Sequence, residues 1–142
     1  MINLLPAEVW NKSTTFLDPC CKSGIFLHEI FLKLMESENL INEFPDKSER
    51  RRHILQNQLY GIALDPVCQL MTARTVYGTV NGQNNIKLIN NYTDIIKNKD
   101  NKFFKEALKE KFVQMNFDVV VGNPPDSTDN GGGGQIKNKS IL

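Results

Sequence analysis

The polar segment Asn123-Pro124-Pro125 follows directly on the apolar run Val119-Val120-Val121-Gly122. The three valines predict a buried parallel strand, and Gly122 lets the backbone come close to a ligand. The two prolines fix the backbone and remove two amide donors, so the loop offers mainly acceptors, with the Asn123 side chain among them. Because ligands bind at the carboxyl ends of strands in open α/β sheets, the segment predicts an acceptor site for a group that carries N–H donors.

A second segment that could bind a ligand is Asp18-Pro19-Cys20-Cys21-Lys22-Ser23-Gly24, a turn of small residues. It lies between the short apolar strand Thr15-Phe16-Leu17 and a predicted helix over Ile25–Met35. Strand, small-residue loop and helix are typical of a nucleotide-binding unit, in which backbone N–H groups meet the ligand. An ordinary helix start is the alternative interpretation, with Asp18 as the cap and Pro19 in the first turn.

Two further acids follow predicted strands, Asp65 after residues 58–64 and Asp94 after residues 86–90. A carboxylate at a strand end is suited to the hydroxyl groups of a ribose. For Asp65, the N-cap of the helix over Val67–Tyr77 is at least as well supported. The basic run Arg50-Arg51-Arg52 suits phosphate, although a solvated helix face is the favoured interpretation.

The order of predicted elements, strand and helix in alternation with short loops, indicates an α/β fold with a parallel sheet and helices on both faces. Four strands are counted, and the last helix is expected over Lys102–Met115. Its apolar side chains predict an inward face made of Phe103, Ala107, Leu108 and Phe112. In the helix over Val67–Tyr77, one face is shared by Val67, Leu70, Met71 and Arg74.

The composition restricts the class of protein. A chain of 142 residues is expected to form one domain at most, and a net charge of +1 gives no global attraction to DNA. Cys20, Cys21 and Cys68 lack metal-site spacing and indicate reduced cytoplasmic thiols, so no metal site is predicted. The sequence shows no signal peptide and no stretch long enough for a membrane helix.

The two motifs together resemble S-adenosylmethionine-dependent amino-methyltransferases, and the chain is similar to bacterial DNA adenine-N6 methylases of the Eco57I restriction–modification type. Asn123-Pro124-Pro125 matches that family's Asn/Asp-Pro-Pro-Tyr/Phe motif. The family's methionine-binding loop, Asp-Pro-Ala-Cys-Gly-Ser-Gly, is matched at Asp18, Pro19, Cys21, Ser23 and Gly24. The resemblance implies a Rossmann-like class I methyltransferase fold, truncated after about four of seven strands, over residues 1–125, with a flexible glycine-rich tail over 126–142.

The resemblance also implies roles for these residues. S-adenosylmethionine would be bound by Asp18, Pro19, Cys21, Ser23 and Gly24, with Asp65 at its ribose and Asp94 at its adenine amino group. The catalytic loop Asn123-Pro124-Pro125 would accept the N–H groups of an adenine flipped out of double-stranded DNA. The implied protein is a cytoplasmic restriction–modification methyltransferase with DNA as its partner and no membrane association.

Three residues depart from the family pattern. Lys22 occupies a glycine position and would be strained if that position required a positive φ. Ala63 stands where the ribose-binding acid usually falls, and Asp126 replaces the aromatic residue that stacks on the base. These departures motivate an alternative, a non-catalytic remnant or split-methylase subunit that acts only in association with a second chain. An unrelated dehydrogenase-like domain ranks low because Gly-x-Gly-x-x-Gly is absent.

Overall fold

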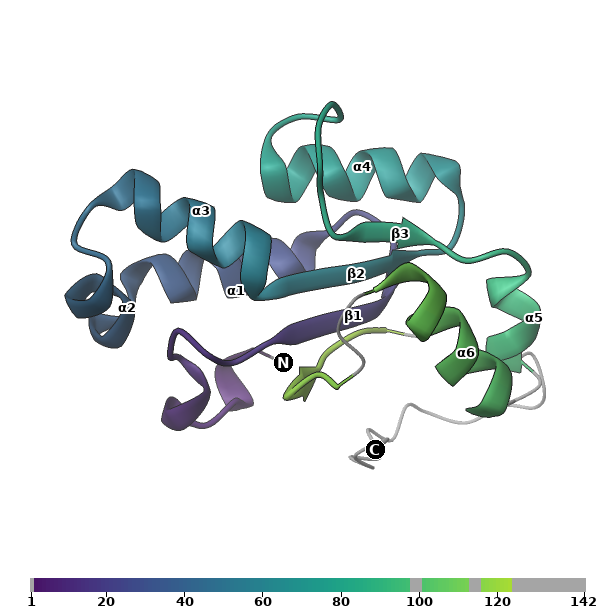
Figure 1. Cartoon of the computed structure of the whole chain (residues 1–142), viewed down its shortest axis with the longest axis horizontal. Helices are drawn as coiled ribbons and strands as arrows, with labels where there is room; N and C mark the ends of the chain where they lie inside the picture. The colour runs from purple at the N-terminus through teal and green to yellow at the C-terminus, as the bar shows by residue number, and fades with distance from the viewer. Residues whose placement is uncertain (1, 98–100, 113–115, 124–142) are drawn as a thin grey trace.

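The computed structural model describes residues 2–97, 101–112 and 116–123, and the described chain forms one parallel sheet (Figure 1). The strand order is β3-β2-β1-β4, and all three pairings are parallel. The strands are β1 (Phe16–Cys21), β2 (Leu59–Ala63), β3 (Ile86–Leu88) and β4 (Val119–Val120). The predicted parallel sheet is therefore confirmed, with β1 in its interior and β4 on the far side of β1 from β2.

Helices cover both faces of this sheet, as the alternation predicts. The helices are α1 (Ile25–Glu36), α2 (Glu38–Glu43), α3 (Lys47–Asn57), α4 (Pro66–Tyr77), α5 (Tyr92–Lys97) and α6 (Asn101–Lys111), preceded by the 3-10 turns η1 (Ile2–Leu4) and η2 (Ala7–Val9). Side chains of α1, α3 and α4 pack with Phe16 in one core, whereas α5 and α6 pack with Leu17 in the other. Successive residues of β1 thus serve opposite faces, which gives the α/β fold its three layers.

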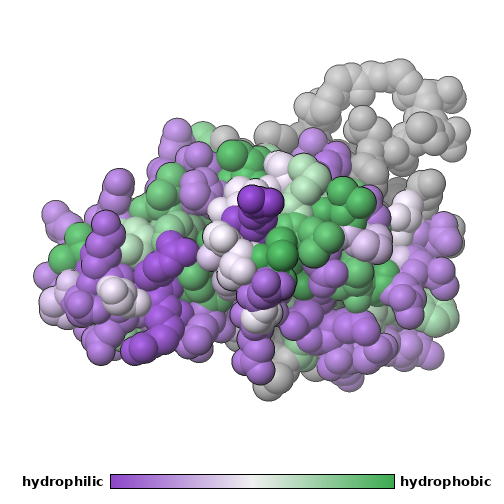
Figure 2. Space-filling view, turned by 90° about the horizontal axis from the view of Figure 1, so that it is seen from above, coloured by the Kyte–Doolittle hydropathy of each residue, from purple (hydrophilic) through white to green (hydrophobic). Residues whose placement is uncertain are grey.

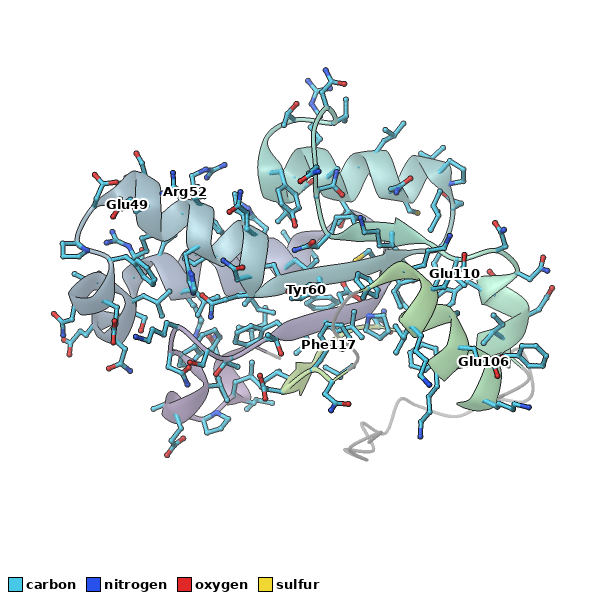
Figure 3. The ribbon with its side chains drawn as sticks, viewed as in Figure 1. Glu49, Arg52, Tyr60, Glu106, Glu110 and Phe117 are labelled. Atoms are coloured by element: carbon cyan, nitrogen blue, oxygen red, sulfur yellow. The ribbon has the colours of Figure 1, made fainter. Side chains whose placement is uncertain are left out.

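The inward face of α6 matches the prediction at Ala107, Leu108 and Phe112 and differs at Phe103. Phe103 is 58% exposed, whereas Leu108 and Phe112 are buried, so the expectation for Phe103 is wrong. Phe104 takes the inward position because its ring stacks on Tyr92. In the same layer, Tyr60 and Phe117 lie close together, with ring centroids 5.1 Å apart (Figure 3).

Helix α4 turns its largest apolar side chains outward. Val67, Leu70 and Met71 are 65%, 53% and 49% exposed, whereas Thr72 and Ala73 face the core. Figure 2, which views the molecule from the side of α4, shows apolar side chains gathered on this surface. Among the described residues, no helix combines the length and the apolar character needed to cross a membrane.

The start of β4 is fastened to β1 by an acid. Asp118 Oδ2 accepts hydrogen bonds from the Thr15 amide at 2.8 Å and from Thr15 Oγ1 at 2.9 Å, and Thr15 is buried. Beyond this clamp, Val119 pairs with Phe16 and Val120 with Leu17. The short strand β4 therefore depends on side-chain bonds as well as on its ladder.

Asp118→Ala is expected to lower the free energy of unfolding by about 1–2 kcal/mol, because it leaves the Thr15 amide and hydroxyl without their acceptor. Urea unfolding followed by circular dichroism measures the change. Asp118→Asn is the matched control, since it keeps one acceptor oxygen and should lose less. Equal losses in the two variants would contradict an acceptor role for Asp118.

Candidate active site

The two motifs meet at β1 and β4, where the order of strands along the sheet reverses. Strands β1, β2 and β3 follow one another toward one edge, and β4 lies on the opposite side of β1. Because all strands are parallel, their carboxyl ends share one edge of the sheet, and the crevice for a ligand is expected between β1 and β4. Asp18 and Pro19 are the two middle residues of β1, and Gly122 and Asn123 follow β4 within three residues.

Gly122 brings the motifs into direct contact. A Cβ atom at this position would lie 2.8 Å from Asp18 Oδ1, closer than real Cβ atoms approach, and 3.0 Å from Pro19 Cδ, which is tighter than most real contacts. Only glycine fits there without displacing β1. Asn123, the next residue, is therefore held near the Asp18-Pro19 segment, and its side chain is exposed. Pro124, Pro125 and Asp126 lie outside the described residues.

Strand β1 continues further than the sequence predicts, through Cys21, so the expected turn from Asp18 onward is shortened to Lys22–Gly24. Asp18 pairs with Gly61 and Cys21 with Ala63, so β1 holds one extra residue between these pairs. Such an irregularity bends a strand and redirects its side chains. Asp18 is left only 2% exposed, and its Oδ1 accepts a hydrogen bond from the Cys20 amide at 2.9 Å.

Burial raises the pKa of the Asp18 carboxyl, although hydrogen bonds from Cys20 and Cys21 and the charge of Lys22 oppose the change. An acid whose pKa is raised in the folded state favours folding at low pH and loses that contribution as the pH rises from its ordinary value of 3.8. The ionised Asp18 carboxylate is thus held at a cost to stability.

Asp18→Asn is expected to gain stability relative to the unmodified protein as the pH rises from about 4 to about 7, because the amide carries no charge to desolvate. Urea titrations at several pH values measure the difference in unfolding free energy. Asp46→Asn is the control, since Asp46 is an exposed helix cap. A difference between Asp18→Asn and the unmodified protein that stays constant with pH would contradict this prediction.

Cys21 is a packing residue. Its side chain is fully buried in the core beneath α1, and burial raises the pKa of its thiol far above the ordinary range. The thiol points across β2, where a Cβ at Gly61 would lie only 2.5 Å from Sγ. The Cys21 thiol is directed away from solvent and is not available to a ligand. Any contribution of Cys21 to ligand binding would therefore come from its backbone.

The rest of the loop is open. Lys22 and Ser23 are exposed, and Gly24 caps α1 with a φ of 80°, in the left-handed region that favours glycine. Among the described residues other than glycine, only Asn91 has a positive φ, so Lys22 is not strained. The concern about a lysine at this position is therefore removed. Gly24 also approaches α4 closely, since a Cβ there would lie 3.0 Å from Thr72 Cα.

Asp65 caps α4, as one of its two interpretations predicts. Its Oδ1 accepts a hydrogen bond from the Cys68 amide at 2.7 Å, and this bond lowers the pKa of the exposed carboxyl. Ala63, where the family's acid would fall, is fully buried at the end of β2. A contact between Asp65 and a ribose stays a prediction.

The segment after β3 contains the predicted residue Asp94 and a further candidate, Asn91, which the sequence patterns did not indicate. Asp94 lies exposed in the first turn of α5, and its amide donates to the Asn91 carbonyl at 3.0 Å. Asn91 itself is exposed and has a φ of 56°. An asparagine just after a strand is a recognisable signal for this conformation. Asn91 and Asp94 are thus both available to a ligand at this edge.

The basic run on α3 is mostly structural. Arg50 is only 8% exposed and donates to the Phe44 carbonyl at 2.7 Å, so a solvated position is wrong for this residue. Arg51 donates to the Tyr77 carbonyl and lies 5.1 Å from the centre of the Phe31 ring. Arg52 projects from α3 on the outer side, as Figure 3 shows. Arg50 and Arg51 therefore fasten α3 to its neighbours, while Arg51 and Arg52 are exposed, as the solvated helix face predicts.

A parallel sheet flanked by helices, with polar residues after its strand ends, is typical of α/β domains that bind nucleotide-like ligands at that edge. The family model described as Eco57I restriction-modification methylase matches residues 57–131, which is more than half of the chain. The chain belongs to this family of methylases. The resemblance noted from the two motifs is confirmed.

A curated relative supports the same conclusion. The chain is 25% identical over 181 residues to a protein of Mycoplasma pneumoniae described as an uncharacterized adenine-specific methylase. The alignment covers 89% of this chain and 42% of the relative, so the chain spans less than half of the relative's length. No solved structure matches the chain.

Proposed function

We propose that this chain carries the cofactor-binding and acceptor elements of a DNA adenine-N6 methyltransferase of a restriction–modification system. The substrates are S-adenosylmethionine and an adenine flipped out of double-stranded DNA. The observation that carries the proposal is the contact of Gly122 with Asp18 and Pro19. A methyl donor held by the first motif and an amino group held by the second would be adjacent there, as transfer requires.

The residues at the strand ends fit such a cofactor. Lys22 and Ser23 are exposed, so a ligand can reach the loop at these two residues, while the buried Gly24 lets the loop pack closely against α4. Asp65 and Asp94 are exposed carboxylates, suited to ribose hydroxyls and to the adenine amino group, and Asn91 offers an amide close to Asp94. Asp18 is buried beneath the loop, where its charge favours a ligand ammonium group, and Pro19 and Cys21 shape the backbone above it.

In this reaction the chain's own residues would position the amino group and accept its N–H groups. The amino group of adenine is conjugated with its ring and is a poor nucleophile. The Asn123 oxygen and the carbonyl between Pro124 and Pro125 would accept its two N–H groups, which frees the nitrogen lone pair. The bound cofactor supplies an electrophilic sulfonium methyl. A C–N bond forms while the C–S bond breaks with its electron pair on sulfur, and the surplus proton leaves the nitrogen for water.

Methyl transfer from labelled S-adenosylmethionine to mixed-sequence duplex DNA tests the proposal. Digestion to deoxynucleosides should place the label on N6-methyl-2′-deoxyadenosine. Label on cytosine would contradict the assignment to adenine. Calorimetric titration with S-adenosylhomocysteine tests the cofactor site by itself, and an absence of binding at millimolar ligand would refute that part.

A further inference from the structure

A buried tyrosine links two strand ends that are not neighbours in the sheet. Tyr92 begins α5, shortly after β3, and only 2% of its side chain is exposed. Its hydroxyl donates a hydrogen bond to the carbonyl of Pro19 in β1. Since β2 separates β3 from β1, the side chain passes across the end of β2 to reach this carbonyl.

The phenol ring is held on more than one side. It stacks on Phe104 of α6, with ring centroids 6.2 Å apart, and it packs in the same core as Leu17 and Cys20 of β1. Burial raises the pKa of the Tyr92 hydroxyl well above its ordinary value, so the group stays protonated and acts as a donor. The Pro19 carbonyl therefore has a permanent partner.

Pro19 transmits this constraint to the acceptor loop. Its ring carbon Cδ lies 3.0 Å from where a Gly122 Cβ would be, and Gly122 directly precedes Asn123. We propose that Tyr92 is a positioning residue. Through Pro19 it sets the distance between the Lys22–Gly24 loop and Asn123, and hence between methyl donor and amino acceptor. This inference rests on the proposed methyl transfer for its consequence, although the linkage itself can be measured without any ligand.

Tyr92→Phe removes the hydroxyl and keeps the ring. Tyr77→Phe is the matched control, because the Tyr77 hydroxyl also donates to a backbone carbonyl, that of Leu55 at 3.1 Å, and it accepts from the Asn85 amide. Leu55 and Asn85 precede β2 and β3, so this second tyrosine lies at the amino ends of the strands. Both variants lose a buried phenol hydrogen bond, but only Tyr92→Phe loses one at the candidate site.

Amide hydrogen exchange of the ligand-free chain is the first measurement. Tyr92→Phe is expected to exchange about five- to tenfold faster at residues 20–24 and 122–123, whereas Tyr77→Phe leaves these amides unchanged. The second measurement is affinity for S-adenosylhomocysteine, which Tyr92→Phe should weaken about tenfold and Tyr77→Phe should not change. If Tyr92 had only a structural role, Tyr92→Phe and Tyr77→Phe would have the same effect on exchange at these amides and on the affinity.

Exchange at residues 20–24 and 122–123 that is the same in both variants overturns the inference, whatever the affinity shows. If the unmodified chain fails to bind S-adenosylhomocysteine, the proposed function fails, and the exchange comparison still decides whether Tyr92 positions the loop. Should Tyr92→Phe not fold, Phe104→Leu serves instead. It withdraws the stacked ring but leaves the hydroxyl, and it should raise exchange at the same amides to a smaller extent.

Discussion

Asn123→Ala is expected to slow methyl transfer by about 10²–10³-fold while leaving the affinity for S-adenosylhomocysteine nearly unchanged. The side-chain oxygen would act on the adenine amino group, and alanine has no acceptor to offer. The proposed cofactor residues Asp18 and Pro19 lie on β1, and their contacts with Gly122 do not involve the Asn123 side chain. A large loss of rate with unchanged cofactor affinity is therefore the expected signature.

Single-turnover transfer to adenine-containing duplex DNA measures the rate, and calorimetry measures the affinity. Asn123→Asp keeps an acceptor oxygen and should retain more activity than alanine does. Asn42→Ala, an exposed position on α2, controls for the loss of a surface asparagine. Full activity in Asn123→Ala would remove this residue from the proposed chemistry.

Gly61→Ala is expected to lower the free energy of unfolding by about 1–3 kcal/mol, a large effect for the addition of one methyl group. The new Cβ would lie 2.5 Å from Cys21 Sγ, 3.0 Å from Ile86 Cδ1 and 3.1 Å from Leu27 Cδ1. All three neighbours are buried, so none can move into solvent. The usual gain from replacing a strand glycine by alanine is smaller than this overpacking.

The double variant Gly61→Ala with Cys21→Ala tests the cause. Removing the sulfur opens the space that the new methyl needs, so the double variant should be more stable than the sum of the single changes implies. Urea unfolding of the four proteins gives the coupling energy. Strict additivity would show that the contact between Cys21 and position 61 is not the source of the loss.

The sheet, its strands and the capping role of Asp65 follow from local patterns in the sequence. Apolar runs such as Val119–Val121 predict strands, and Asp65-Pro66 predicts a helix start. The choice between Phe103 and Phe104 on α6 does not follow from such patterns. The two are adjacent apolar residues, and the inward one is Phe104, whose ring stacks on Tyr92 of α5.

The orientation of α4 has a similar explanation. Val67, Leu70 and Met71 have helical spacing, yet they are exposed, because the close approach of Gly24 to Thr72 requires small residues on the inner face. Local sequence patterns also do not predict contacts between distant segments. The proximity of Gly122 to Asp18, and the bond from Tyr92 to Pro19, join residues far apart in the chain, whose meeting depends on strand order.

The clamp between Thr15 and Asp118 joins residues 103 positions apart, whereas β1 and β2 are joined through a much shorter stretch of chain. Closing the longer loop carries the larger entropic cost, and β4 offers only two ladder pairs to offset it. Docking of β4 is therefore expected to be a late step in folding, after β1, β2 and β3 have assembled. A ligand that bridges the Lys22–Gly24 loop and Asn123 would bind only the docked form, and so would shift the folding equilibrium toward it.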